Sequence, residues 1–123
     1  DGVRARAVVD TGSARTLVAK PFARDHYMSM SSTPMPPMIA LDGSLVEVLG
    51  TLTVTLERTD GPVTLPPIEV SAYVVESLSV VDSDVLIGND VITSSGGLHL
   101  QYDEDGCLSN VVIGTLAAKS PDV

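Results

Sequence analysis

Short runs in which apolar and polar residues alternate recur along most of the chain and predict strands rather than helices. Residues 51–56 alternate threonine with leucine or valine, and residues 3–9 alternate apolar residues with two arginines. Each run predicts a strand with one buried face. Residues 85–87 predict a short, fully apolar strand. Residues 98–102 and 107–113 flank an Asp-Glu-Asp-Gly turn and predict a hairpin.

Prolines and glycines interrupt these runs. Pro21 suits the first turn of a helix that continues for about two turns, and Asn89 begins a second, brief helix. Three prolines make residues 30–38 irregular, Gly50 predicts a bulge or bend, and the proline pair at 66–67 is expected to weaken a strand at its middle. The total of about eight short strands and at most two short helices predicts an all-β domain of the barrel or sandwich type.

Composition bounds the class of protein. The chain has 123 residues, enough for one domain with a single core, which we expect over residues 1–116 with a flexible tail at 117–123. A net charge of −9 argues against a nucleic-acid or anionic-membrane partner. No apolar run approaches membrane-spanning length. The first residue is not methionine, so the sequence is expected to be a piece of a longer chain.

Cysteine and histidine offer little chemistry. Cys107 is the one cysteine, which excludes an internal disulfide and suits a reducing, intracellular compartment; we expect it to be buried as a small apolar residue. His26 and His99 have no cysteine or carboxylate partner at metal-ligand spacing. The sequence therefore predicts no metal site and no cofactor.

Asp10 is the main candidate for chemistry. It follows the apolar residues 7–9 and begins an Asp-Thr-Gly-Ser turn, whose glycine permits close approach of other groups. A carboxylate in this position is costly unless it is hydrogen-bonded, paired or functional. A turn aspartate that accepts hydrogen bonds from nearby backbone N–H groups is the alternative interpretation.

Two further motifs follow in order, at residues 41–50 (Leu-Asp-Gly-Ser-Leu-Val-Glu-Val-Leu-Gly) and 85–90 (Val-Leu-Ile-Gly-Asn-Asp). With residues 10–13, they make the chain resemble the retropepsin-like aspartic proteases. This family includes retroviral and LTR-retrotransposon proteases and the protease-like domain of DNA-damage-inducible ubiquitin-shuttle proteins. The resemblance covers about residues 2–114. It implies a closed β-barrel protomer with one or two short helices, forming a two-fold homodimer.

The resemblance also implies an aspartic endopeptidase that cleaves extended segments of a polyprotein, in the cytoplasm or within virus-like particles, without a cofactor. One chain carries one Asp-Thr-Gly, so the two carboxylates would be Asp10 from each of two copies. By analogy with the family, Thr11 would brace the two loops, the Gly12 backbone would allow close approach, and the Ser13 hydroxyl would donate to the outer carboxylate oxygen.

The remaining site residues come from the other two motifs. The hairpin resembles the flap that closes over a substrate, with substrate-binding residues Leu41, Asp42, Gly43, Ser44, Leu45 and Val46. Val85 and Ile87 are candidate pocket walls, although ordinary core packing is the more common role of such residues. Gly88, Asn89 and Asp90 resemble the structural signature.

The chain departs from the family pattern in two places. Asn89 stands where many members carry arginine, so a salt bridge found in some relatives is absent. The family's first strand is expected to be missing from this piece, because only nine residues precede Asp10.

Two other functions stay open. One is a cellular, shuttle-type relative with a narrow range of ubiquitin-linked substrates. The other is a catalytically inactive barrel that serves in dimerisation or peptide binding.

Overall fold

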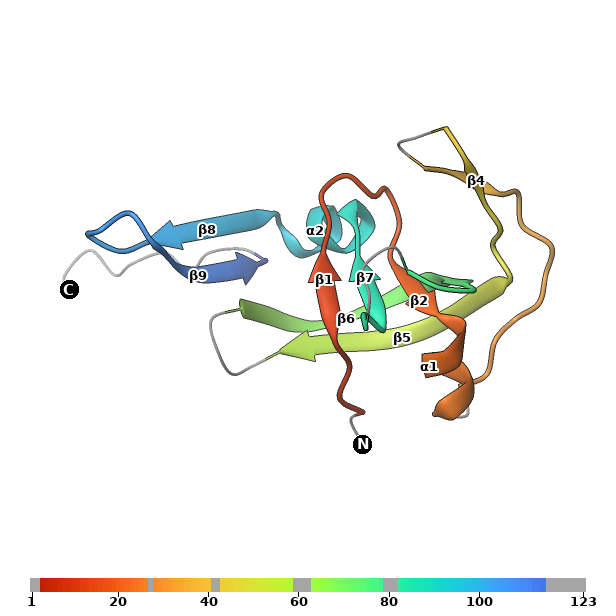
Figure 1. Cartoon of the computed structure of the whole chain (residues 1–123). Coiled ribbons are helices and arrows are strands. Elements are labelled where there is room, and N and C mark those ends of the chain that lie inside the picture. The colour runs from red at the N-terminus through yellow and green to blue at the C-terminus, as the bar shows by residue number, and fades with distance from the viewer. Residues whose placement is uncertain (1–2, 27, 41–42, 59–62, 79–81, 115–123) are drawn as a thin grey trace.

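The computed structural model describes residues 3–26, 28–40, 43–58, 63–78 and 82–114, and these form a mostly β structure with two short helices (Figure 1). The predicted all-β class is confirmed, and the predicted tail at 117–123 lies outside the described residues. In chain order the elements are β1 (Ala7–Val9), β2 (Leu17–Ala19), α1 (Lys20–Asp25), β3 (Met38–Ile39), β4 (Leu45–Val46), β5 (Gly50–Arg58), β6 (Val63–Val75), β7 (Val85–Ile87), α2 (Asn89–Ser95), β8 (Leu98–Tyr102) and β9 (Leu108–Ile113).

Seven of the strands form one curled sheet. Its order is β1-β7-β2-β6-β9-β8, and β5 pairs with β6 in a long antiparallel ribbon. In Figure 1 the short strands β1 and β7 cross this ribbon at a steep angle, and the β8–β9 hairpin extends away from the body. The strands β3 and β4 form a separate two-stranded hairpin. Closure of the sheet into a barrel stays a prediction.

The proline pair does not break a strand. The strand β6 runs through Pro66 and Pro67, which lie opposite an irregularity in β5 between Leu56 and Arg58. On its other side β6 pairs with β9 before the prolines and with β2 after them. The residues that lack an N–H group therefore fall where β6 changes neighbours and few ladder hydrogen bonds are lost.

Three local predictions were wrong. The first strand spans only Ala7–Val9, and Val3 is half exposed, because β1 pairs with β7 through its last residues alone. Gly50 begins β5 instead of bending it; a Cβ there would collide with the Ser31 carbonyl oxygen, which bridges to Thr51. Cys107 is exposed, since it lies in the turn that precedes β9.

The core lies between the sheet and the two helices. Phe22 and Ala23 of α1 and Val91 and Ile92 of α2 are buried against strand residues. The other buried members are Val18, Leu52, Leu65, Ala72, Val74, Val85, Ile87 and Ile113. In the described part of the chain, neither helix has the length and apolar character needed to cross a membrane.

Ile113 anchors the β8–β9 hairpin to this core. Its side chain is fully buried, so we expect Ile113→Ala to lower the free energy of unfolding by about 2–5 kcal/mol. Chemical denaturation checks this. The matched control is Ile39→Ala, whose side chain is 75% exposed and whose effect should stay within about 0.5 kcal/mol. Equal losses in both variants would contradict the core assignment.

Candidate active site

The backbone of Asp10 is fixed by the sheet. Asp10 directly follows β1, whose last residue, Val9, pairs with Ile87 of β7 in parallel register. The Asp10 N–H then donates to the Ile87 carbonyl oxygen at 2.9 Å. The β1–β7 pair at the edge of the sheet therefore delivers the carboxylate to the loop at its end, where the side chain is partly exposed.

The Asp10 carboxylate is oriented by its own loop. The Gly12 N–H donates to Asp10 Oδ1 at 2.8 Å, and the Ser13 N–H donates to the Asp10 carbonyl oxygen at 3.2 Å. A Cβ on residue 12 would lie 3.1 Å from Oδ1, so glycine leaves room for this contact. No residue of the described ranges donates to Oδ2, which stays available for a reacting group.

The start of α2 hydrogen-bonds to the backbone of the same loop. Asn89 Nδ2 donates to the Thr11 carbonyl oxygen at 2.6 Å, and the Asn89 N–H donates to the Ser13 carbonyl oxygen at 2.8 Å. Gly88 makes the approach possible, because a Cβ there would lie 2.5 Å from the Arg15 carbonyl oxygen. At the position where the family pattern has arginine, Asn89 thus hydrogen-bonds to the Asp10 loop directly.

A partly buried hydrogen-bond network joins the loop to α2. Thr16, which is fully buried, donates from Oγ1 to Asp90 Oδ1 at 2.7 Å and from its N–H to Asp90 Oδ2 at 3.0 Å. The Gly88 N–H donates to Thr16 Oγ1 at 3.1 Å, and the Val91 N–H donates to Asp90 Oδ1 at 2.8 Å. Sequence reasoning missed Thr16, because one threonine before an apolar run carries no signal of burial.

Ser13 and Thr11 are placed differently from each other. The Ser13 hydroxyl was expected to donate to the catalytic carboxylate, and instead it donates to the Arg15 carbonyl oxygen at 2.8 Å. In this chain it stabilises the turn. Thr11 is exposed beside Asp10, which leaves its predicted contact with a second copy open.

The predicted flap forms a hairpin whose tip lies outside the described residues. Met38 pairs with Val46 and Ile39 with Leu45. The Ala40 N–H donates to the Ser44 carbonyl oxygen, and Gly43 has a φ of 85°, a conformation that favours glycine. Leu41 and Asp42 are the predicted substrate-binding residues that fall in the undescribed tip. In Figure 1 this hairpin and the β1–β2 loop lie at the same upper side of the molecule.

Val85 and Ile87 are core residues. They are 2% and 6% exposed and belong to the main apolar cluster. Their side chains are therefore not open to a substrate, and the packing role that was weighed for them fits the structure.

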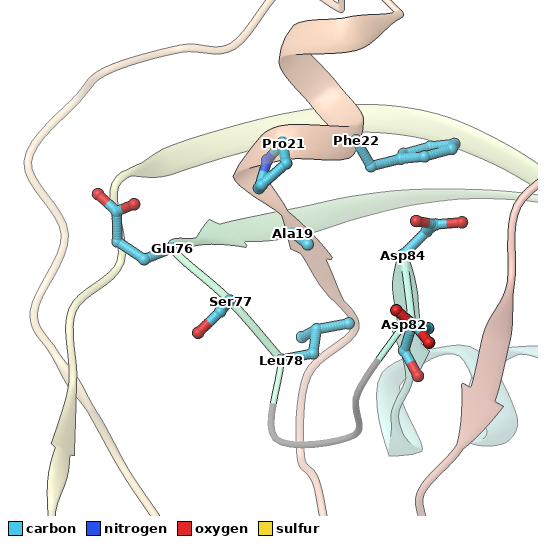
Figure 2. Close-up of a pocket in the computed structure, with 9 residues that line it drawn as sticks. Ala19, Pro21, Phe22, Glu76, Ser77, Leu78, Asp82 and Asp84 are labelled. Atoms are coloured by element: carbon cyan, nitrogen blue, oxygen red, sulfur yellow. The ribbon is translucent and has the colours of Figure 1, made fainter.

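A hollow of about 360 Å³ lies elsewhere, beside α1 and the start of β7 (Figure 2). Its walls include Phe22 and the acidic side chains of Glu76, Asp82 and Asp84. Asp84 precedes β7, whereas the Asp10 loop lies at the far end of that strand, next to Ile87. The hollow is thus separate from the Asp10 loop. Across the described ranges, no group of three or more His, Cys, Asp or Glu side chains is arranged to hold a metal ion.

Comparisons of the chain with models of protein families, with curated proteins and with solved structures found no match.

The Thr16 network is expected to stabilise the site. Thr16→Val removes a hydroxyl that links the Gly88 N–H to the Asp90 carboxylate and leaves both groups short of a partner. We expect it to lower the free energy of unfolding by about 1–3 kcal/mol, measured by urea denaturation. Thr53→Val is the matched control, because Thr53 is exposed on β5, where valine fits equally well. A loss in the control as large as that in Thr16→Val would contradict this role.

Proposed function

We propose that this chain is the protomer of an aspartic endopeptidase of the retroviral or retrotransposon type. The observation that carries the proposal is the Asp10 loop itself. Its carboxylate is partly exposed and is oriented by a hydrogen bond from the Gly12 N–H. The start of α2 hydrogen-bonds to the loop that carries this carboxylate. A structural turn aspartate would also accept the Gly12 N–H, so the feature that favours catalysis is the partly exposed Oδ2, to which no described residue donates.

The chemistry requires two carboxylates that face one water molecule. A single chain has one Asp-Thr-Gly, so a second copy supplies the other Asp10 across a two-fold axis. Two carboxylates at about 3 Å separation cannot both be ionised, so they share one proton and titrate as a unit. The pair of aspartates in aspartic proteases is the best-known example of this effect.

In the proposed reaction, the ionised Asp10 takes a proton from the water, and the water oxygen bonds to the peptide carbonyl carbon. The protonated Asp10 gives its proton to the carbonyl oxygen, which produces a tetrahedral diol. Collapse of the diol re-forms the carbonyl and breaks the C–N bond. The departing nitrogen takes up the proton held by the first carboxylate, and the proton returned by the diol hydroxyl restores the shared-proton pair.

The β3–β4 hairpin is the element proposed to close over the substrate. An extended peptide beneath it gains strand-like hydrogen bonds and is shielded from water. Ile39 and Leu45 pair across this hairpin and are both largely exposed, which gives it an apolar face for a substrate side chain or for the second copy's hairpin.

The β8–β9 hairpin offers the surface for the second copy. Leu100, Tyr102 and Leu108 are 49%, 59% and 52% exposed. Tyr102 pairs with Leu108, and Ser109 has no opposite residue because the register shifts there. This shift places Leu108 on the same face of the hairpin as Leu100 and Tyr102. That face continues outward from the buried Ile113.

The strand β8 is also the edge of the sheet, so its outer backbone groups can pair with another chain. The proposed dyad demands a second copy, and this face is where we place it.

Asp10→Asn tests the enzyme assignment. Asparagine is nearly isosteric and still accepts the Gly12 N–H, yet it cannot act as a base, so peptide cleavage should fall at least a thousandfold with the fold unchanged. Cleavage is measured with and without a statine-type inhibitor of aspartic proteases. The control is Asp25→Asn, because Asp25 is exposed at the end of α1 and its ion pair with Arg24 lies at the surface. Full activity in Asp10→Asn would contradict the proposal, and a folded dimer that never cleaves would favour a peptide-binding module.

Leu108→Asp tests the dimer surface. A charge on the apolar face of β8–β9 should weaken dimerisation roughly tenfold or more, because a buried carboxylate would have no partner there. Sedimentation equilibrium provides the measurement. Gln101→Glu adds the same charge on the opposite face of β8 and should leave the dimer affinity unchanged. A dimer that tolerates Leu108→Asp as well as Gln101→Glu would place the interface elsewhere.

A further inference from the structure

Arg15 is a cation held in place beside the Asp10 loop. Its Nη2 donates to the Tyr73 hydroxyl at 2.9 Å, and its guanidinium carbon lies 4.6 Å from the centre of the Tyr73 ring. Tyr73 is in turn fixed in β6, between Leu17 of β2 and Thr51 of β5. One hydrogen bond and one ring contact therefore orient an exposed side chain that would otherwise have many rotamers.

No carboxylate among the described residues neutralises the Arg15 charge. In the described ranges no carboxylate lies within ion-pair distance of Arg15, whereas Lys20 pairs with Glu76 and Arg24 with Asp25. This contrasts with the chain as a whole, which has 16 acidic and 7 basic residues. A guanidinium carries five N–H donors, so the bond to Tyr73 leaves most of them available for a carboxylate.

The position of Arg15 sets its distance from the bond that would be cleaved. The strand β7 separates β1 from β2, so the end of β1 and the start of β2 are two strand spacings apart, about 10 Å. Asp10 follows β1, and Arg15 lies one residue before the buried Thr16 that precedes β2. The guanidinium rests on Tyr73 of β6, the strand next to β2, so it lies about two to three strand spacings from Asp10, which corresponds to about three to four residues of an extended peptide.

We propose that Arg15 selects substrates with an acidic side chain about three to four residues from the cleaved bond. The inference rests on the proposed endopeptidase function. The two-fold dimer would place one Arg15 on each side of the dyad, so the preference should appear on both sides of the cut. The bound carboxylate would accept hydrogen bonds from two N–H groups of the guanidinium, while the contacts with Tyr73 hold the guanidinium in its orientation.

The test is a digest of a complex mixture of natural peptides, with cleavage sites read by mass spectrometry. Wild type should show roughly tenfold enrichment of Asp and Glu within two to four residues of the cut. Arg15→Glu should reverse the preference toward Lys and Arg, and Arg15→Met, which retains a long apolar stem, should abolish it without reversal. Arg4→Glu is the matched control: Arg4 is exposed before β1, so the variant makes the same change in net charge and should keep the acidic preference.

The outcomes separate the two proposals. Asp10-dependent cleavage with no acidic enrichment, or with the same enrichment in Arg15→Glu, overturns the role of Arg15 and leaves the endopeptidase intact. A dimer that cleaves no peptide in the mixture overturns the proposed function, and the substrate preference with it. Loss of preference in Arg4→Glu would show that overall charge, and not Arg15, selects the substrate.

Discussion

The contact between the Asp10 loop and α2 is the interaction on which the rest of the site depends. Its centre is the fully buried Thr16, which lies between the Asp90 carboxylate and the Gly88 N–H. A partly buried carboxylate is costly unless its oxygens are hydrogen-bonded, and Asp90 accepts three hydrogen bonds. These hydrogen bonds fix the conformation of the loop, because any displacement of the loop would break several of them together.

The same contact explains why glycine stands at residue 88. Backbone oxygens of Ser13 and Arg15 pack against the place where a side chain would begin. The loop and the start of α2 therefore meet backbone to backbone, and Asn89 adds a bond to the Thr11 carbonyl oxygen. The hydrogen-bonded loop that carries Asp10 and a small, separate hairpin of two-residue strands lie at the same side of the molecule. The proposed catalysis uses both features, a fixed dyad and a closing cover.

The distribution of charge near the Asp10 loop differs from that of the chain as a whole. The chain is strongly acidic, yet the loop that carries Asp10 also carries a cation that Tyr73 orients. A cation near the site offsets part of the repulsion that an acidic protein exerts on acidic segments of a substrate. In this proposal the acidic surface excludes most such segments, and Arg15 admits those whose carboxylate falls at the right spacing.

Much of the fold was predictable from local pattern. Alternation along residues 51–56 and the apolar run at 85–87 correspond to strands β5 and β7, and Pro21 and Asn89 mark the two helices. These features depend on the period of the side chains and on the conformations open to proline, which are properties of the chain itself. The Asp-Gly turn at residues 105–106 likewise joins β8 to β9, with Asp103 Oδ1 accepting two backbone N–H groups.

The sequence by itself thus determined the all-β class, the order of the elements and the residue that ends the first strand with a carboxylate. Only the tertiary structure decided the burial of Thr16, the continuity of β6 through two prolines and the exposure of Cys107. It also decided that Ser13 bonds to Arg15, and that Arg15 rests on Tyr73, which is 58 residues away. The burial of Thr16, the path of β6 and the contact of Arg15 with Tyr73 depend on which strand lies beside another, and partners brought together by a sheet are distant in sequence. Local periodicity therefore cannot encode them.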